Sequence, residues 1–399
     1  MRKFFLILLT TVFVFTNISG IFAAPDIYGE AYILIDGKSG QVLLEHEIHK
    51  KLHPASTTKI LTTIIALEKS KLSDIVTISK NVPLVEGTKV YLREGEKITL
   101  EKLLNAVMLH SANDAALAVA EHIAGTQEKF AGLMNEKAQE IGAKESTFVN
   151  PHGLTDENHL TTAYDLALLA RYAMQNPQFR ELAAKKVYDW EGEEWQTRLI
   201  NKNKFLWRMD EATGVKMGYT SEAKYTVVAS AQKDNRELIA VILGSNDNRI
   251  WDDARDLLNY GLEHFQNLSL AQNNQVVATI KMKDNQEINL ISDRSASIAV
   301  ANNAETNVER KLVLDEIETP IEEGKVLGQL VISVNGEEKE RIPVKAAEGV
   351  KKPFPWNRVI INTLAGIFLL QITWRITRRF RRKRTTMFNS YGRRGSPYR

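Results

Sequence analysis

Apolar segments near the two ends constrain this chain more than any other feature, because they limit where the rest of it can fold. Residues 4–15 are almost wholly apolar and follow Arg2 and Lys3. This arrangement is typical of a signal peptide, and we expect residues 1–23 to be removed by cleavage after Ala23. An uncleaved N-terminal anchor is the alternative, although the apolar run is short for a membrane span.

The second apolar segment lies near the C-terminus. Residues 359–374 carry no charged side chain, tryptophans flank them, and residues 375–399 contain ten Arg and Lys and no acidic residue. Aromatic residues mark membrane interfaces, and clustered Arg and Lys mark the cytoplasmic side. We therefore expect a membrane-anchoring helix over 358–376, transmembrane rather than lying on the surface, and a basic cytoplasmic tail over 377–399. The body of the protein would then be extracytoplasmic, held at the cell membrane.

Between these segments the chain first mixes strand-like and helix-like patterns. Over residues 25–265, β-type runs at both ends enclose a long stretch of helical periodicity. The order favours an α+β domain whose antiparallel sheet joins both ends of the stretch. The expected strands are 31–36, 41–44, 225–232 and 238–244, and the expected helices are 57–69, 100–109, 115–123, 127–141, 163–174 and 253–265.

Residues 268–346 instead alternate short β-rich runs with polar turns. Leu330, Ile332 and Val334 alternate with other residues just before Asn335-Gly336, a strong hairpin signal. We expect a small all-β domain here, with no catalytic residues of its own. A linker containing Pro and Lys follows over 347–357.

Composition excludes several classes of function. The chain has no Cys, so disulfides, thiolate metal sites and cysteine nucleophiles are excluded. Its eight His residues show no metal-binding spacing, and we expect no metal or cofactor. The net charge of +3 arises from the basic tail, since the rest of the mature chain is acidic. A nucleic-acid-binding surface is therefore not expected.

The first candidate for chemistry is Ser56-Thr-Thr-Lys59, at the start of an expected helix. Residues three apart on a helix face the same side, so the Lys59 amine can reach the Ser56 hydroxyl. A serine hydroxyl is a weak nucleophile until a neighbouring base takes its proton. The pattern is common, so its weight depends on what accompanies it.

Two further elements follow along the chain. Ser111-Ala-Asn113 lies on a tight connection between two helical runs, where a hydroxyl and an amide can face a cleft; a helix cap is the alternative. Lys216-Met-Gly218 opens the second group of β-type segments. It offers a positive charge and, at the glycine, a close approach of backbone; a solvated strand end is the alternative.

Together the three elements resemble the Ser-x-x-Lys, Ser-x-Asn and Lys-x-Gly set of penicillin-recognising serine enzymes. The chain resembles the low-molecular-mass penicillin-binding proteins that act as D-alanyl-D-alanine carboxypeptidases, over roughly residues 28–380. Other stretches similar to that family are Pro54–Ile60, Tyr91–Ile98, Asn150–Leu154 and Gly218–Ala223.

The resemblance implies a β-lactamase/transpeptidase-like catalytic domain that acts on peptidoglycan stem peptides and is acylated by β-lactam antibiotics. In its terms Ser56 is the nucleophile, Lys59 the base and Ser111 a proton relay. The backbone N–H groups of Ser56 and Tyr219 would form the oxyanion hole. The implied substrate-binding residues are Asn113, Lys216, Gly218, Tyr219 and Arg249.

Met217 departs from the family pattern, which has Thr at this position. Because Met has no hydrogen-bond donor, we expect weaker substrate binding or slower acylation, and we keep a catalytically weak penicillin-binding scaffold as an alternative. A β-lactamase is a further alternative, although the loop Glu157–Thr161 only partly matches the required pattern. We interpret His152 and His159 as loop-fixing residues, since a Ser–Lys mechanism needs no imidazole.

Overall fold

The computed structural model describes residues 24–282, 286–351 and 356–391, and the expected signal peptide lies outside them. Two compact units are present. The first unit comprises the chain up to Gln272 with Ser295–Glu309 and Ser333–Glu337. The second unit comprises Asn273–Arg294, Arg310–Ile332 and the chain from Glu338 onward.

A five-stranded antiparallel sheet forms the centre of the first unit. Strand β1 pairs with its neighbour β2 and also with β9, which comes much later in the sequence. This pairing confirms the expected sheet that joins both ends of the stretch. The order is β2-β1-β9-β8-β7, with bounds Val42–His46, Ala31–Asp36, Arg236–Ser245, Lys224–Lys233 and Ala212–Thr220. Strand β7 therefore lies at one edge of this sheet.

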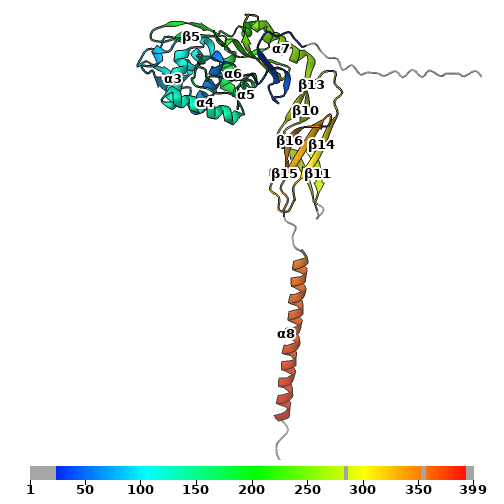
Figure 1. Ribbon diagram of the computed structural model, residues 1–399. Helices are drawn as coiled ribbons and strands as arrows, with labels where there is room; N and C mark the ends of the chain where they lie inside the picture. Colours follow the sequence, from blue (N-terminus) through cyan, green and yellow to red (C-terminus); the bar gives the residue numbers. More distant parts are fainter. Residues whose placement is uncertain (1–23, 283–285, 352–355, 392–399) are drawn as a thin grey trace, which may run out of the picture. The chain divides into compact units, whose positions relative to one another are not determined.

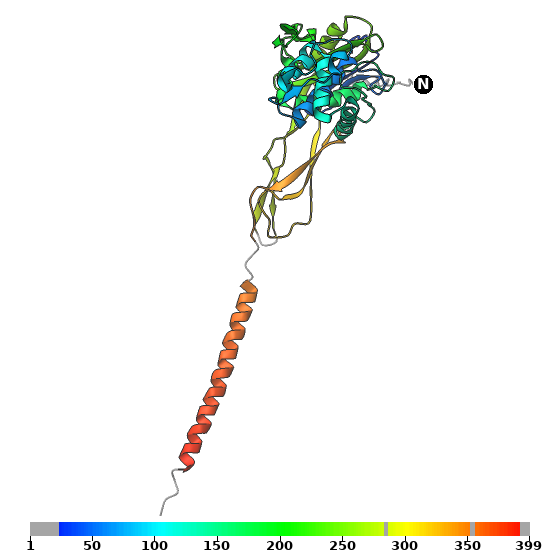
Figure 2. The ribbon, with the colours of Figure 1, turned by 90° about the vertical axis from the view of Figure 1, so that its left-hand side faces the viewer.

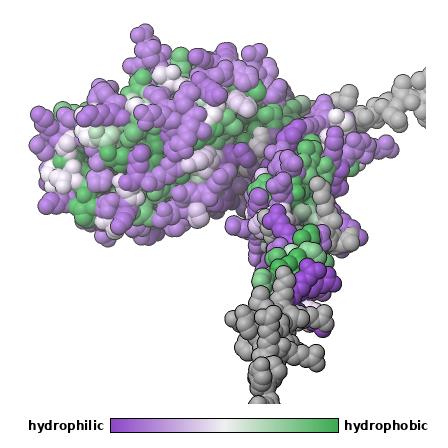
Figure 3. Space-filling model, turned by 90° about the horizontal axis from the view of Figure 1, so that it is seen from below, coloured by the Kyte–Doolittle hydropathy of each residue, from purple (hydrophilic) through white to green (hydrophobic). Residues whose placement is uncertain are grey.

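Helices cover both faces of the sheet. One hydrophobic core lies between the sheet and a helical layer around α1, and a second lies between the sheet and α7. The helices of that layer, several of which are grouped together in Figure 1, are α1 (Lys59–Lys69), α2 (Leu100–Asn105), α3 (Asn113–Ala124), α4 (Gln127–Ile141), α5 (Ala163–Met174) and α6 (Pro177–Ala184). Helix α7 spans Ile250–His264. In Figure 3, hydrophilic residues cover most of the visible face of this unit.

Local chemistry explains several helix ends. Thr126 and Thr162 cap α4 and α5, each accepting a hydrogen bond from a backbone N–H in the first turn. The expected helix 100–109 is α2 followed by a π-helical turn, η3 (Ala106–His110), which ends at Ser111 with φ of 63°. A π turn shifts the side chains that follow it, and such turns are frequent at functional sites.

Some short elements of the first unit carry no periodic signal in the sequence. They are the β5–β6 hairpin (Val187–Glu191 and Gln196–Ile200), the β3–β4 pair (Ile75–Thr77 and Lys97–Thr99), and the 3₁₀ turns η1 (Ala55–Thr58), η2 (Val82–Leu84) and η4 (Lys204–Trp207). Their segments are short or rich in charged residues, so their conformation depends on tertiary contacts. The first unit also contains the β10–β13 pair (Phe265–Ala271 and Ala296–Ala301), whose second strand was expected among the β-rich runs of residues 268–346.

The second unit contains a five-stranded β-sheet, drawn as long ribbons in Figure 2. Its order is β11-β12-β16-β15-β14, with bounds Val276–Lys281, Glu287–Ser292, Glu337–Ala346, Val326–Val334 and Val308–Leu314. Alternate residues such as Ile288 and Leu290 are fully buried, as expected for strands with one face in a core. The expected combination of an α+β domain and an all-β domain is confirmed.

Helix α8 spans Trp356–Tyr391. Its stretch Trp356–Arg381 is long and apolar enough to cross a membrane. The helix continues beyond residue 376, where we expected the anchoring segment to end. The reason is local, since the Arg-rich segment is free of helix breakers until Gly392 and Arg is a good helix former.

Candidate active site

Ser56 and Lys59 lie at the junction between the η1 turn and helix α1. The Lys59 amine is 3.1 Å from the Ser56 hydroxyl. The turn is held by its own threonines, because Thr57 donates to the Pro54 carbonyl and Thr58 to the Ala55 carbonyl. Ser56 is partly exposed whereas Lys59 is fully buried, so the hydroxyl can be reached from solvent while the amine is kept away from water.

The three contacts of the Lys59 amine fit a neutral base. Besides Ser56, its Nζ atom contacts the side-chain oxygen of Asn113 at 2.7 Å and the His152 carbonyl at 2.5 Å. Both of these oxygens can only accept hydrogen bonds. A neutral amine has two N–H donors and one lone pair, so in that form the donors satisfy these oxygens and the lone pair is left for the Ser56 hydroxyl. The geometry is that of a general base.

The orientation of the Asn113 amide is determined by its other end. Its Nδ2 atom donates to the Glu86 carbonyl at 2.8 Å, so its oxygen must be the atom that faces Lys59. Asn113 is also the first residue of helix α3, and its backbone N–H donates to the Thr88 carbonyl. The expected association of Asn113 with Ser56 and Lys59 is therefore present.

Electrostatics favour the neutral form of Lys59. Burial lowers the pKa of its amine well below the usual value, and the positive charges of Lys216 and Lys202 lower it further. A buried amine without a paired carboxylate gives up its proton more easily than one in water. The neutral amine of Lys59 is therefore favoured at a pH at which an ordinary lysine is protonated.

Ser111 lies opposite this pair, next to Lys216. It follows the η3 turn in a left-handed conformation, which few residues other than glycine adopt readily and which is common at functional sites. The Lys216 amine is 3.1 Å from the Ser111 hydroxyl and 2.9 Å from the Met217 carbonyl. Burial, followed by the charge of Lys202, lowers the pKa of Lys216 to about 7.

Gly218 lets strand β7 approach the nucleophile. A Cβ atom at this position would lie 2.5 Å from the Ser56 nitrogen and 2.8 Å from the Ala55 Cβ, so no larger residue fits. Thr226 of the neighbouring strand donates to the Pro54 carbonyl at 3.0 Å and ties the sheet to the same turn. The backbones of Ser56 and β7 therefore lie side by side, next to Tyr219.

A loop between α4 and α5 supplies the His152 carbonyl. The Asn150 side chain accepts the Gly153 N–H at 2.7 Å and the His152 N–H at 3.3 Å, forming a tight turn. Gly153 has φ of 84°, and a Cβ there would lie 1.8 Å from the Ala55 oxygen. The sequence analysis assigned no role to the Asn150 side chain or to the His152 carbonyl, although Asn-Pro-x-Gly is recognisable turn chemistry.

Both histidines of this region are neutral and fixed. Burial lowers the pKa of His152 to about 3 and that of His159 to about 4. His159 accepts the Val149 N–H at its Nδ1 atom, so its Nε2 atom carries the proton and donates to Thr58 at 2.8 Å. These contacts support the interpretation of His152 and His159 as loop-fixing residues.

Lys202 is a site residue that the sequence did not reveal. Its backbone N–H donates to the Leu109 carbonyl, and its amine donates to the Thr88 hydroxyl at 3.1 Å. From there its charge lowers the pKa of Lys59, Lys216 and His110. In the sequence it belongs to a polar run that is typical of a solvated loop, so no signal was available.

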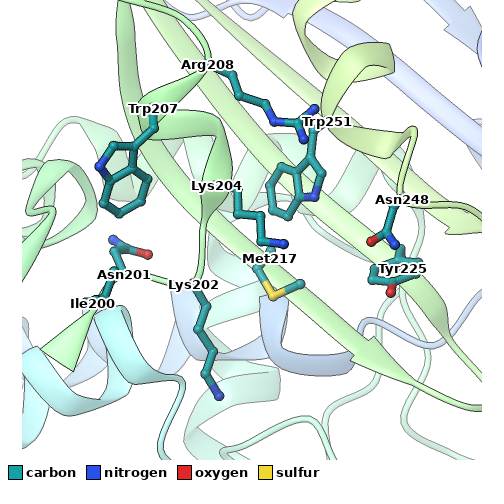
Figure 4. Close-up of a pocket in the computed structure, with 10 residues that line it drawn as sticks. All are labelled: Ile200, Asn201, Lys202, Lys204, Trp207, Arg208, Met217, Tyr225, Asn248 and Trp251. Atoms are coloured by element: carbon teal, nitrogen blue, oxygen red, sulfur yellow. The ribbon is translucent and has the colours of Figure 1, made fainter.

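Arg249 and Met217 lie at the edge of this region. Arg249 immediately precedes α7, where its guanidinium is 3.4 Å from Asp253 and 4.3 Å from the centre of the Tyr28 ring. Its role as a carboxylate contact stays a prediction. Met217 pairs with Val227 across β7 and β8, and its thioether lines a cavity of about 680 Å³ shown in Figure 4.

Comparison with known proteins identifies the family of this site. Residues 20–247 match the family model described as D-alanyl-D-alanine carboxypeptidase. The chain belongs to the D-alanyl-D-alanine carboxypeptidase family. Residues 265–352 match the model described as the C-terminal domain of penicillin-binding protein 5.

Individual relatives agree with this assignment. D-alanyl-D-alanine carboxypeptidase DacF of Bacillus subtilis is 34% identical over 331 residues, covering 80% of this chain and 85% of the relative. DacC of Escherichia coli is 31% identical, and the match covers 84% of this chain and 88% of DacC. The crystal structure of penicillin binding protein 5 from Haemophilus influenzae has a TM-score of 0.73 at 25% identity, covering 83% and 100% of the two chains.

Family membership confirms the resemblance drawn from the motifs. The chain is a hydrolase, a serine-type D-Ala-D-Ala carboxypeptidase, with the catalytic and C-terminal domains of its family. The apolar part of helix α8 fits a membrane anchor.

Proposed function

We propose that this carboxypeptidase removes the terminal D-alanine from peptidoglycan stem peptides through an acyl-enzyme on Ser56. The observation that carries the proposal is the environment of the Lys59 amine. It lies 3.1 Å from the Ser56 hydroxyl, and its other two contacts are oxygens that can only accept hydrogen bonds. A buried amine with these partners is a base aimed at one hydroxyl.

In the first step Lys59 takes the hydroxyl proton, and Ser56 Oγ attacks the carbonyl carbon between the two D-alanines. Negative charge develops on the carbonyl oxygen, which accepts hydrogen bonds from the backbone N–H groups of Ser56 and Tyr219. Each such donor contributes on the order of 10²–10³ in rate. The close approach of Gly218 to the Ser56 nitrogen supports this arrangement.

Ser111 then passes a proton to the departing amine, the C–N bond breaks, and D-alanine leaves. Lys216 orients the Ser111 hydroxyl and supplies positive potential for the terminal carboxylate. Asn113 holds the substrate backbone, and Arg249 provides a second carboxylate contact. Water then hydrolyses the ester and regenerates the free Ser56 hydroxyl.

The proposal includes a location and an inhibitor class. The body is extracytoplasmic and held at the cell membrane by α8, whose Arg-rich end lies in the cytoplasm. Its partners are peptidoglycan stem peptides and the membrane, and β-lactam antibiotics acylate Ser56. Support comes from the apolar stretch Trp356–Arg381 and from relatives that are penicillin-binding proteins.

The test is D-alanine release from a stem pentapeptide by the full chain in detergent, compared with its Ser56→Ala variant. We expect release by the wild type and none above background by the variant. Fluorescent penicillin should label the wild type and leave the variant unlabelled. Equal release by both proteins contradicts the mechanism. Labelling without release by the wild type supports a catalytically weak enzyme, the absence of both supports the scaffold alternative, and rapid turnover of penicillin supports the β-lactamase alternative.

A further inference from the structure

The cavity beside Met217 is not accounted for by the removal of a residue as small as D-alanine. It has a volume of about 680 Å³, within the range of roughly 300–1,000 Å³ that is usual for small-molecule sites. Figure 4 shows the Met217 thioether in the middle of the cavity, with Trp207 on one side and Tyr225 on the other. The side chain of D-alanine is a single methyl group and would leave most of this space unfilled.

Two lining residues connect the cavity to the candidate active site, because Met217 directly follows Lys216 and the charge of Lys202 lowers the pKa of Lys59 and Lys216. The departing amine takes its proton from Ser111, and Ser111 is held by Lys216 at 3.1 Å. Met217 directly follows Lys216 on edge strand β7, while Gly218 lies against the nucleophile. On the proposed function, a substrate whose carbonyl meets Ser56 and whose amine meets Ser111 has its last residue beside the Lys216–Gly218 stretch of β7, to which Met217 belongs.

The walls of the cavity are mainly apolar. Trp251 is 2% exposed and forms a rigid inner wall, whereas Trp207 is 48% exposed and can change its contacts when a ligand enters. Tyr225 and Met217 are half-buried between them. Flat rings and a flexible thioether together suit a large apolar or aromatic side chain.

The charges of the lining residues are positive. Lys202 and Lys204 both line the cavity, as Met217 does, and all three are drawn in Figure 4. Arg208 also lines it and is paired with Asp252 at 3.2 Å. A terminal carboxylate is attracted by these cations, and a cationic side chain is repelled.

We propose that this cavity is a leaving-group subsite that accepts a D-amino acid with a large apolar or aromatic side chain in place of D-alanine. The inference rests on the proposed function, because the same acyl transfer takes place. Ser56 forms an ester with the penultimate D-alanine, the C–N bond breaks, and the released D-amino acid carries the proton from Ser111. Its side chain occupies the space between Trp207 and Trp251, and Lys204 takes the place of the missing threonine hydroxyl as a carboxylate contact.

The test compares stem peptides that differ only in the last residue: D-Ala, D-Met, D-Trp or D-Lys. We expect kcat/KM for D-Met and D-Trp to exceed that for D-Ala about tenfold, since one methylene in an apolar pocket changes specificity by roughly that factor. D-Lys has nearly the length of D-Met and should be the poorest leaving residue. Equal values for D-Met and D-Ala, or a preference for D-Lys, would overturn the inference.

Variants of the lining residues test whether the cavity causes the preference for large apolar leaving residues. Trp207→Ala should lower the D-Trp to D-Ala ratio of kcat/KM about tenfold, and Trp207→Phe should restore most of it. Lys204→Gln should raise KM for every peptide, whereas Lys233→Gln, at the other end of β8, should leave it unchanged. An unaltered ratio in Trp207→Ala contradicts the subsite. Failure of the wild type to release any D-alanine instead contradicts the proposed function.

Discussion

The surroundings of Lys59 and those of Met217 differ in how tightly their groups are held. Lys59 is fully buried, and its three contacts come from a turn, a helix start and a loop that are themselves hydrogen-bonded. The cavity beside Met217 is lined by long side chains, several of them exposed. The difference indicates that the acylating chemistry depends on a rigid backbone framework, while recognition of the leaving group depends on side chains that can vary.

The largest expected effect comes from a change in the rigid surroundings of Lys59. Lys59→Ala removes the base and leaves the Asn113 and His152 oxygens without their donor. We expect kcat/KM for D-alanine release to fall by about 10³-fold, since a positioned general base contributes roughly 10²–10⁴. The measurement is D-alanine release, with thermal melting as a check of folding. Lys69→Ala, at the exposed end of the same helix, is the control, and a comparable loss in both variants would count against the assignment.

A smaller effect concerns the charge of Lys216, which lies between the surroundings of Lys59 and those of Met217. The pKa of Lys216 is about 7, so its amine is protonated below that pH and loses its charge as pH rises through it. We expect kcat/KM for a peptide with a free terminal carboxylate to fall about tenfold for each pH unit above 7, because the protonated fraction of the Lys216 amine falls by that factor. A peptide amide should show no such fall. The Lys216→Arg variant keeps its charge, so its kcat/KM should no longer fall above pH 7. A pH profile identical to that of the wild type would contradict the role of the Lys216 charge.

The smallest expected effect comes from a change in the cavity beside Met217. Met217→Thr introduces a hydroxyl donor where the family pattern has one, and we expect kcat/KM for a D-alanine-terminated peptide to rise about fivefold, from a net hydrogen-bond contribution of about 1 kcal/mol. The same change replaces an apolar part of the cavity wall by a smaller, polar side chain, so the ratio of D-Trp to D-Ala turnover should fall. Steady-state kinetics with both peptides measure this, and an unchanged or lower D-alanine rate would show that the methionine is no handicap.

Most of the fold was accessible from the sequence because its periodic segments are long. Helices α1, α4 and α5 and strands β1, β8 and β9 lie where hydrophobic spacing placed them. The β5–β6 hairpin and the π turn before Ser111 were missed. Their short or charged segments adopt these conformations only against the rest of the unit.

The candidate site shows the same division. Motif order predicted that Ser56, Ser111 and Lys216 belong to one site, since each lies in a recognisable pattern. Neither the His152 carbonyl nor the amine of Lys202 has a sequence signature. Backbone carbonyls are present at every residue, and a lysine in a polar run is usually solvated, so only their positions in space give them a role.

By itself, then, the sequence determined the class of chemistry, the family and the order of strands and helices, because these depend on residue identity and on hydrophobic periodicity. The tertiary structure alone decided how the Lys59 amine is deprived of its proton and what surrounds Met217. Burial, the charges of Lys202 and Lys216 and the shape of a cavity arise from residues far apart in the chain. No local pattern records such distances.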